Sequence, residues 1–165
     1  MSHRTAAEIR EVLTGVGPFR LHHGGSTAVG TIWAKDIVDI YVETAAICEC
    51  TRCLVAAGWR SMYEDDRQAD LNFGYTPEGF APAVFHLHIR KPGACDELYF
   101  RDYLMDHPDT AKAYEALKLS HWKQFEHDRD GYTAAKSDFI RQVLEQAKAL
   151  YGPRYEWDGN EKSTL

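Results

Sequence analysis

The chain lacks any apolar run near the ~20 residues needed to cross a bilayer, and its first ten residues carry no signal-peptide core. These absences predict a cytoplasmic protein without a membrane partner. A basic excess is also missing, because the formal net charge is −6. Non-specific nucleic-acid affinity comes mainly from Lys and Arg side chains that neutralise phosphates, so general nucleic-acid binding is not expected. A small ligand that carries phosphate is compatible with this charge.

The four cysteines lack the paired CxxC spacing of zinc knuckles. Cys48, Cys50 and Cys53 fall within one expected helix, on which residues two apart point about 200° away from each other. Cys48 and Cys50 therefore cannot hold one ion together. We expect small, reduced cysteines that are partly buried, with a structural zinc site as the alternative.

With 165 residues, of which 44% are hydrophobic, the chain can bury one core. We expect a single α+β domain over 1–165, with a sheet-containing part at about 1–93, a helical part packed on it at about 94–151, and a tail at 152–165 that frays. Periodicity and turn residues place the elements. Strands are expected at 19–23, 37–43, 59–63, 71–75 and 84–90, helices at 5–15, 44–57, 97–106, 108–127 and from 130 onward, and loops at 64–70 and 76–82.

The stretch 19–43 carries the clearest functional pattern. β-Branched residues favour a strand from Ile37 onward, and side chains alternate between the two faces of a strand. Asp39, Tyr41 and Glu43 therefore share one face, and the residues between them face the core. Two carboxylates on a polar strand face indicate a site for a divalent cation.

Gly24 and Gly25 come directly before Ser26 and Thr27. Glycine lets backbone N–H groups approach an anion closely, and the two hydroxyls add hydrogen-bond donors. A Gly-Gly-Ser-Thr turn next to an acidic strand suggests a phosphate beside a cation. The pattern predicts a metal-assisted phosphoryl-transfer or nucleotidyl-transfer site.

A series of blocks resembles the GrpB-like family, whose members are regarded as nucleotidyltransferases. The blocks are Gly25-Ser26-Thr27-Ala28-Val29 preceded by His23, Ala34-Lys35, Ile37-Val38-Asp39-Ile40, His86-Leu87-His88, Phe100-Arg101-Asp102-Tyr103-Leu104, His107-Pro108, Tyr114 with Lys118, and Tyr132 with Lys136 and Phe139-Ile140. The resemblance spans about 23–147. It implies a nucleotidyltransferase-like mixed β-sheet with flanking helices, and the metal-dependent transfer of a nucleotidyl group from a nucleoside triphosphate to a small acceptor.

One position departs from the superfamily pattern. Nucleotidyltransferases of this kind place two acids as Asp-x-Asp on the strand, and here the second acid is replaced by Tyr41. A tyrosine hydroxyl has an ordinary pKa of about 10 and is a poor ligand for magnesium. Asp39 is therefore the expected ligand of Mg²⁺ or Mn²⁺, and Glu43 and Asp36 are candidates for a second metal ligand.

The segment Val84–Arg90 is the second informative strand. His86, His88 and Arg90 are expected to project from one face of it, opposite the apolar residues. His86 and His88 are candidates for a general base or for metal ligands, alongside Glu43. Two histidines at this spacing can also bind Zn²⁺, so a zinc site that includes His23 is an alternative.

Candidate phosphate-binding residues lie outside these two strands as well. Lys35 can reach a phosphate near Asp39, and Arg101 can clamp a phosphate or pair with an acid. Tyr114 with Lys118, and Tyr132 with Lys136, are four residues apart and share a helical face. A lysine beside an aromatic ring suits a nucleotide, but it is also ordinary packing.

Three functions fit the sequence. The first is the nucleotidyltransferase, in which Gly25, Ser26 and Thr27 bind phosphate and Asp39 binds the cation. The second is a binding protein for a nucleotide or metabolite that has lost catalysis with the second acid. The third is a zinc-binding hydrolase built on the histidines. The acceptor is not indicated, and a homodimer is compatible with the sequence.

Overall fold

The computed structural model describes residues 3–34, 36–77, 79–124 and 129–160, with the side chains of these residues except at 3–4, 80, 121–124 and 129–135. Among these residues, five strands form one sheet in the order β1-β2-β5-β4-β3. They are β1 (Phe19–Gly24), β2 (Ile37–Thr44), β3 (Arg60–Glu64), β4 (Gln68–Thr76) and β5 (Gly79–Arg90). β2 and β5 run parallel, and the other neighbouring strands are antiparallel. The expected mixed sheet of an α+β fold is confirmed.

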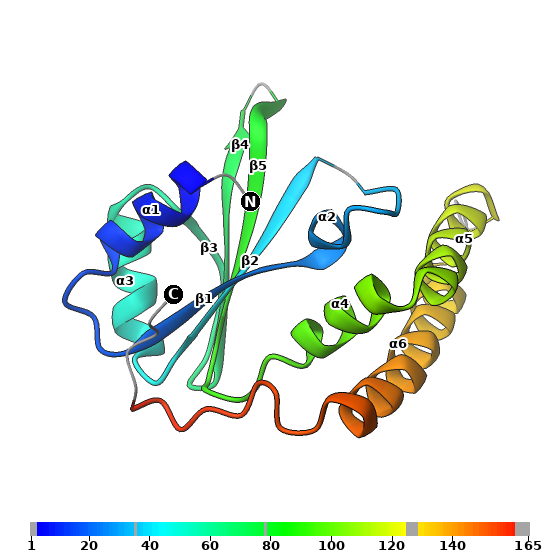
Figure 1. The fold of residues 1–165 in the computed structure, drawn as a ribbon. Coiled ribbons are helices and arrows are strands. Elements are labelled where there is room, and N and C mark those ends of the chain that lie inside the picture. The colour runs from blue at the N-terminus through cyan, green and yellow to red at the C-terminus, as the bar shows by residue number, and fades with distance from the viewer. Residues whose placement is uncertain (1–2, 35, 78, 125–128, 161–165) are drawn as a thin grey trace.

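The helices lie on both sides of this sheet (Figure 1). They are α1 (His3–Val12), α2 (Gly25–Val29), α3 (Ile47–Ala56), α4 (Asp96–Asp106), α5 (Pro108–Gln124) and α6 (Arg129–Tyr151). α1 and α3 cover one face, and α2 and α4 lie on the opposite side, with α5 and α6 beyond α4. In the described part of the chain, no helix is both long and apolar enough to cross a bilayer.

The face under α1 and α3 is the closed core. Ile40 and Val42 of β2 and Leu87 and Ile89 of β5 are fully buried there against Leu54 of α3. Fully burying a side chain of this size stabilises the fold by about 1.5–3 kcal/mol. The alternating residues of β2 and β5 therefore turn toward α4, where the sheet is only partly covered.

α5 and α6 pack on α4 rather than on the sheet. Leu104 of α4 is buried with Tyr114 of α5, and Tyr103 of α4 is buried with Val143 and Ala147 of α6. α4 itself approaches the sheet through Leu98, which is buried against Tyr41. A cleft therefore remains between the sheet and the helical part.

Several expected boundaries are wrong. Gln68–Asp70 belong to β4, and 79–83 belong to β5, so both expected loops are mostly strand. Pro82 is tolerated because β2 pairs with β5 only from Val84 onward, which leaves one edge of the earlier part of β5 without a ladder. Thr44 ends β2 instead of opening a helix, because its hydroxyl bonds to the Pro18 carbonyl and the Ala46 N–H. The Gly-Gly-Ser-Thr segment enters the short helix α2 instead of a simple turn.

The expected fraying of the tail is wrong for residues 152–160. This segment returns from α6 to the sheet (Figure 1). The Arg20 guanidinium lies 4.7 Å from the centre of the Trp157 ring, which is nearly buried. The ring of Tyr155 meets those of Tyr99 and His22 edge to face. Aromatic side chains spaced too irregularly to indicate an element therefore still anchor the segment by packing.

Candidate functional site

Asp39 lies where β1, β2 and α2 meet. Because Gly24 pairs with Asp39 across the β1–β2 ladder, the next residue, Gly25, lies directly against the Asp39 side chain. Gly25 has φ +67°, and a Cβ atom at this position would overlap the Asp39 carboxylate. Only glycine satisfies both the left-handed backbone and this close approach. The glycine expected to serve a phosphate therefore also shapes the space around the acid.

Ser26 is joined to a helix far along the chain. Its Oγ accepts a hydrogen bond of 3.0 Å from Nζ of Lys118 on α5, which also donates to the Trp33 carbonyl at 2.7 Å. The same ammonium lies 5.1 Å from the centre of the Tyr114 ring. Burial lowers the pKa of Lys118 from its usual value. The predicted shared face of Tyr114 and Lys118 is confirmed, and it places a half-buried cation at the predicted phosphate segment.

Ser26 and Asp39 line one cavity of about 930 Å³ between the sheet and the helices. Its basic lining residues are Arg67, Arg90, Lys91, Arg101 and Lys136, and its apolar lining from the helices includes Phe100, Leu104, Ile140 and Leu144. The sequence predicts one site for the segment of Ser26 and the strand of Asp39, and both residues do line this one cavity. The role of each side chain stays a prediction.

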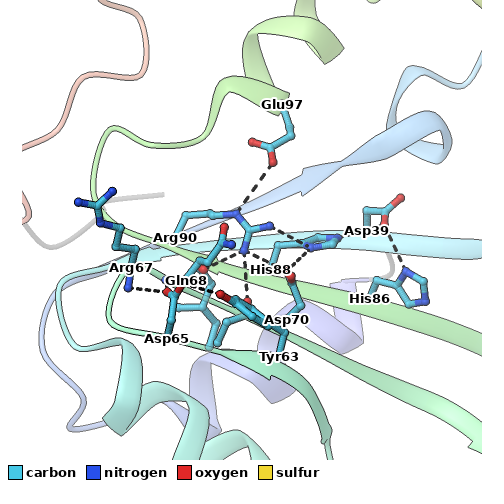
Figure 2. A network of polar contacts seen from close by, with 12 residues as sticks. Asp39, Tyr63, Asp65, Arg67, Gln68, Asp70, His86, His88, Arg90 and Glu97 are labelled. Carbon is cyan, nitrogen blue, oxygen red and sulfur yellow. Dashed lines mark hydrogen bonds and ion pairs between the residues drawn. The ribbon is translucent and has the colours of Figure 1, made fainter. Parts of the chain in front are cut away.

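His86 and His88 face the same acid. β5 pairs with β2 in parallel so that Asp39 lies beside His86, and Tyr41 lies beside His88. Oδ1 of Asp39 is 3.3 Å from Nε2 of His88 and 3.8 Å from Nδ1 of His86 (Figure 2). The predicted common face of the two histidines is confirmed, and the register brings both to Asp39.

Asp70 is the site residue that sequence reasoning missed. It was expected in a solvated loop, but it lies on β4 opposite His88, and its Oδ1 is 2.8 Å from Nδ1 of His88. Arg90 donates to the same oxygen at 3.0 Å and also approaches Glu97 of α4 at 3.9 Å (Figure 2). Burial opposes ionisation of Asp70, but the hydrogen bond from His88 and the charge of Arg90 outweigh it and lower the pKa of Asp70. The alternation of Gln68, Asp70 and Asn72 with apolar residues was the available signal.

Tyr41 fills the position of the missing second acid. Its ring is nearly buried and stacks on the His88 ring with centroids 4.7 Å apart. Burial raises the pKa of Tyr41 far above its usual value, so the hydroxyl stays protonated. Tyr41 therefore packs against the site and supplies no anionic ligand.

Glu43 is not brought to Asp39, contrary to its predicted role as a metal ligand or catalytic residue. It is fully buried, and its two oxygens bind Nε2 of His22 at 2.9 Å and the backbone N–H of Gly93 at 3.0 Å. Four residues along a strand separate it from Asp39 by roughly 13 Å. The polar face of β2 is thus divided, because Gly93, just before α4, and His22 of β1 occupy its far end.

Asp36 and Thr27 also lie away from the cavity. Asp36 is exposed before β2 and is not among the residues that line the cleft, so the predicted second metal ligand is not found there. Oγ1 of Thr27 lies 3.2 Å from Nε2 of His23, so this pair orients α2 rather than facing the ligand space. Lys35 and the side chain of Tyr132 lie outside the described residues, whereas Lys136 lines the cleft as expected.

Of its two predicted roles, Arg101 pairs with an acid, Asp102. Its guanidinium donates to Asp102 at 2.6 and 2.8 Å, to the His23 carbonyl at 2.5 Å and to the Tyr155 hydroxyl at 2.7 Å. Asp102 also accepts from Arg154 at 2.9 Å and from Tyr155. Arg101 borders the cleft, but these bonds use most of its donors to tie α4 to β1 and the tail.

The comparisons with known proteins agree with this architecture. The family model described as GrpB protein matches residues 2–146. The chain belongs to the GrpB family. A UPF0157 protein of Deinococcus radiodurans is 37% identical over 129 residues, which are 78% of this chain and 67% of that relative. A UPF0157 protein of Pseudomonas aeruginosa is 31% identical over 83% of this chain, which spans only 57% of that relative's length.

Solved structures extend the comparison to the fold. The crystal structure of conserved protein GrpB from Enterococcus faecalis has a TM-score of 0.73 at 24% identity, and the match covers 90% of both chains. The Cid1 poly(U) polymerase bound to MgATP has a TM-score of 0.51 at 17% identity over 72% of this chain and 40% of Cid1. At this identity the likeness concerns the fold alone, and it gives the GrpB-family chain a nucleotidyltransferase-like sheet.

Proposed function

We propose that this GrpB-family protein binds a nucleoside triphosphate with Mg²⁺ or Mn²⁺ in the cleft and transfers its nucleotidyl group to a small acceptor. The observation that carries the proposal is that Ser26, with Lys118 bonded to it, and Asp39 border one cavity of about 930 Å³. That volume lies within the range of about 300–1,000 Å³ found for small-ligand sites. The Cid1-like fold supports the reaction class by analogy.

The triphosphate would occupy the end of the cleft near Ser26. Lys118 is half-buried there, and Lys136 lines the cavity from α6. Hydrogen bonds from an ammonium to phosphate oxygens are charge-assisted and gain strength where water is partly excluded. Phe100, Leu104 and Ile140 offer an apolar wall for the base or sugar.

The carboxylate of Asp39 can serve a cation that arrives with the nucleotide. Mg²⁺ commonly keeps one or two protein carboxylates and takes its other ligands from phosphates and water, so one acid is sufficient for a nucleotide-carried ion. The cation supplies charge neutralisation at the phosphate oxygens. Asp39 positions it, and Gly25 leaves the carboxylate room to do so.

The acceptor would approach from the other side of the histidines. A second cavity of about 480 Å³ is lined by His86, His88, Tyr75 and Arg60. His88 borders both cavities, so two substrates can meet beside Asp39. In the step, the acceptor oxygen forms a bond to the α-phosphorus and the bond to the bridging oxygen breaks. The electron pair leaves with pyrophosphate, and the acceptor proton passes to water.

A second candidate is a nucleotide-binding protein without transferase activity. The observation that favours it is Tyr41, which occupies the position of the second acid and is buried and neutral. This candidate keeps the same cleft and the same contacts to phosphate. It differs only in that no pyrophosphate is released.

The test measures nucleotide binding by calorimetry and pyrophosphate release with Mg²⁺ or Mn²⁺, using a deproteinised cell extract as the source of acceptors. We expect binding and release by the unchanged chain. Asp39→Asn should keep the fold and lower release at least 100-fold, whereas Asp36→Asn, at an exposed acid away from the cleft, should change neither property. Binding without release would favour the second candidate. The absence of nucleotide binding would refute both.

A further inference from the structure

In both His86 and His88, the two ring nitrogens have different surroundings. In each ring, the nitrogen that points away from Asp39 is already hydrogen-bonded. Nδ1 of His88 is bonded to Asp70 at 2.8 Å, and Nε2 of His86 is bonded to the Tyr75 hydroxyl at 2.9 Å. The other nitrogen of each ring faces Oδ1 of Asp39. These three ligand atoms all lie within 4.8 Å of one another. Both rings are therefore fixed by a hydrogen bond on the side away from Asp39, with one nitrogen of each directed at that carboxylate. Figure 2 shows His88 bonded to Asp70 and His86 beside Asp39.

The hydrogen-bond chemistry makes this arrangement informative. A carboxylate only accepts, so the short contact with Asp70 assigns the Nδ1 proton of His88 to that bond. In the neutral ring, Nε2 then presents a lone pair to Oδ1 of Asp39, which is also an acceptor. At 3.8 Å, Nδ1 of His86 is too far from the same oxygen for a hydrogen bond. Burial opposes protonation of His88, but the hydrogen bonds to Asp39 and Asp70 raise its pKa, so either a proton on Nε2 or a metal cation between the three atoms removes the conflict.

The spacing also fits one ion. Ligand atoms about 2.1 Å from a metal at tetrahedral angles lie about 3.4 Å apart, close to the 3.3 and 3.8 Å separations at Asp39. Metal-binding histidines usually donate their other ring N–H to a carboxylate, as His88 does to Asp70. Because Asp39 comes from β2 and both histidines from β5, neighbouring strands of one sheet hold the ligands.

We infer that Asp39 Oδ1, His86 Nδ1 and His88 Nε2 form a three-ligand site for a first-row transition-metal dication, which binds in the absence of nucleotide and in preference to Mg²⁺. Imidazole nitrogens suit Zn²⁺ and its neighbours, whereas Mg²⁺ demands oxygen ligands. Asp70 and Tyr75 are positioning residues that orient the two rings. Each ligand side chain is 20–35% exposed; Asp39 and His88 line the larger cavity, and His86 and His88 line the smaller one.

This inference concerns the cleft of the proposed function but does not require the nucleotide. It also separates the roles that the sequence left open for the histidines, because a nitrogen bound to a metal cannot act as a general base. If nucleotide binding fails while the ion is retained, the proposed function falls and this site stands. If nucleotide binds with Mg²⁺ but the transition metal does not, the opposite holds.

The experiment titrates the metal-stripped, untagged full chain with Zn²⁺, Co²⁺ or Mg²⁺ by calorimetry without nucleotide. We expect one Zn²⁺ or Co²⁺ per chain and at least 100-fold weaker binding of Mg²⁺. His86→Ala should lower Zn²⁺ affinity at least 100-fold. Asp70→Asn and Tyr75→Phe should each lower it about 10- to 100-fold. Asp36→Asn should leave it unchanged.

The four free cysteines are the competing zinc ligands in this chain. The Co²⁺ spectrum distinguishes them, because nitrogen and oxygen ligands give no thiolate charge-transfer band. Full Zn²⁺ binding by His86→Ala, a thiolate band, or equal affinity for Mg²⁺ and Zn²⁺ would each overturn the site. Because His86 is the most exposed of the three ligands, His86→Ala is expected to fold, and its circular dichroism and melting temperature check this.

Discussion

Lys118→Gln is the sharpest test of how the cleft holds phosphate. The change removes the positive charge from α5 while keeping a side chain that can donate to Ser26 and to the Trp33 carbonyl. Those two bonds connect a half-buried side chain to partly exposed partners. We therefore expect little loss of stability and a specific loss of nucleotide affinity.

The magnitude follows from the bond that would form. A hydrogen bond to a charged partner contributes about 1.5–3 kcal/mol. Since each 1.4 kcal/mol is a factor of ten in affinity, the dissociation constant should rise roughly 12- to 140-fold. Lys118 is only half-buried, so solvent screening favours the lower part of this range. The difference between the two proteins should shrink as salt is added.

Calorimetry with ATP, GTP, CTP and UTP in the presence of Mg²⁺ measures the effect. Lys112→Gln is the matched control, because Lys112 lies exposed on the same helix and the change removes the same charge. If Lys112→Gln weakens binding as much as Lys118→Gln does, the effect is only one of net charge. Unchanged affinity in Lys118→Gln would refute the phosphate site.

Three further predictions concern the frame of the site. Gly30→Ala should lose about 1–2 kcal/mol of stability because of its left-handed φ. Gly25→Ala has the same backbone cost and also overlaps the Asp39 carboxylate, so it should lose at least as much stability, and it alone should lose nucleotide binding, since a Cβ at Gly30 meets open space. Equal binding by the two variants would contradict the role of the Asp39 contact. Burial opposes ionisation of Asp102, but hydrogen bonds from its neighbours outweigh it and lower its pKa, so its stabilisation is present above about pH 4 and is lost as the pH falls through the folded-state pKa. Asp102→Asn should therefore cost about 1.5–3 kcal/mol at pH 7, and denaturant unfolding should show this difference vanish in acid; a constant difference would refute it. Leu54→Ala should cost about 2–5 kcal/mol without changing nucleotide affinity at a temperature where it stays folded, because Leu54 is fully buried on the closed face.

The features that the sequence predicted correctly follow from local patterns within single strands and helices. Alternation along β2 and β5 indicated which side chains share a face, and that prediction is confirmed at Asp39, His86 and His88. The helical period paired Tyr114 with Lys118. Each of these depends on the geometry of one element, which a short stretch of sequence encodes.

Other features depended on which elements meet. Asp70 has a partner only because β4 pairs with β5 in the register that sets it opposite His88. Glu43 was predicted at the site because it shares a face with Asp39, yet that end of the strand is buried, and Glu43 is bonded to Gly93 and His22. Arg154 and Tyr155 complete the Asp102 cluster from a segment without a periodic pattern.

The sequence by itself thus determined the α+β architecture, the family, and the face on which each polar side chain of a strand lies, because these follow from residue types and their local period. The tertiary structure alone decided that Lys118 reaches Ser26 across 92 residues, that His88 is held between Asp39 and Asp70, and that Glu43 is buried away from both. The physical reason is that strand register and helix packing are set by the whole core, and no short segment contains that information.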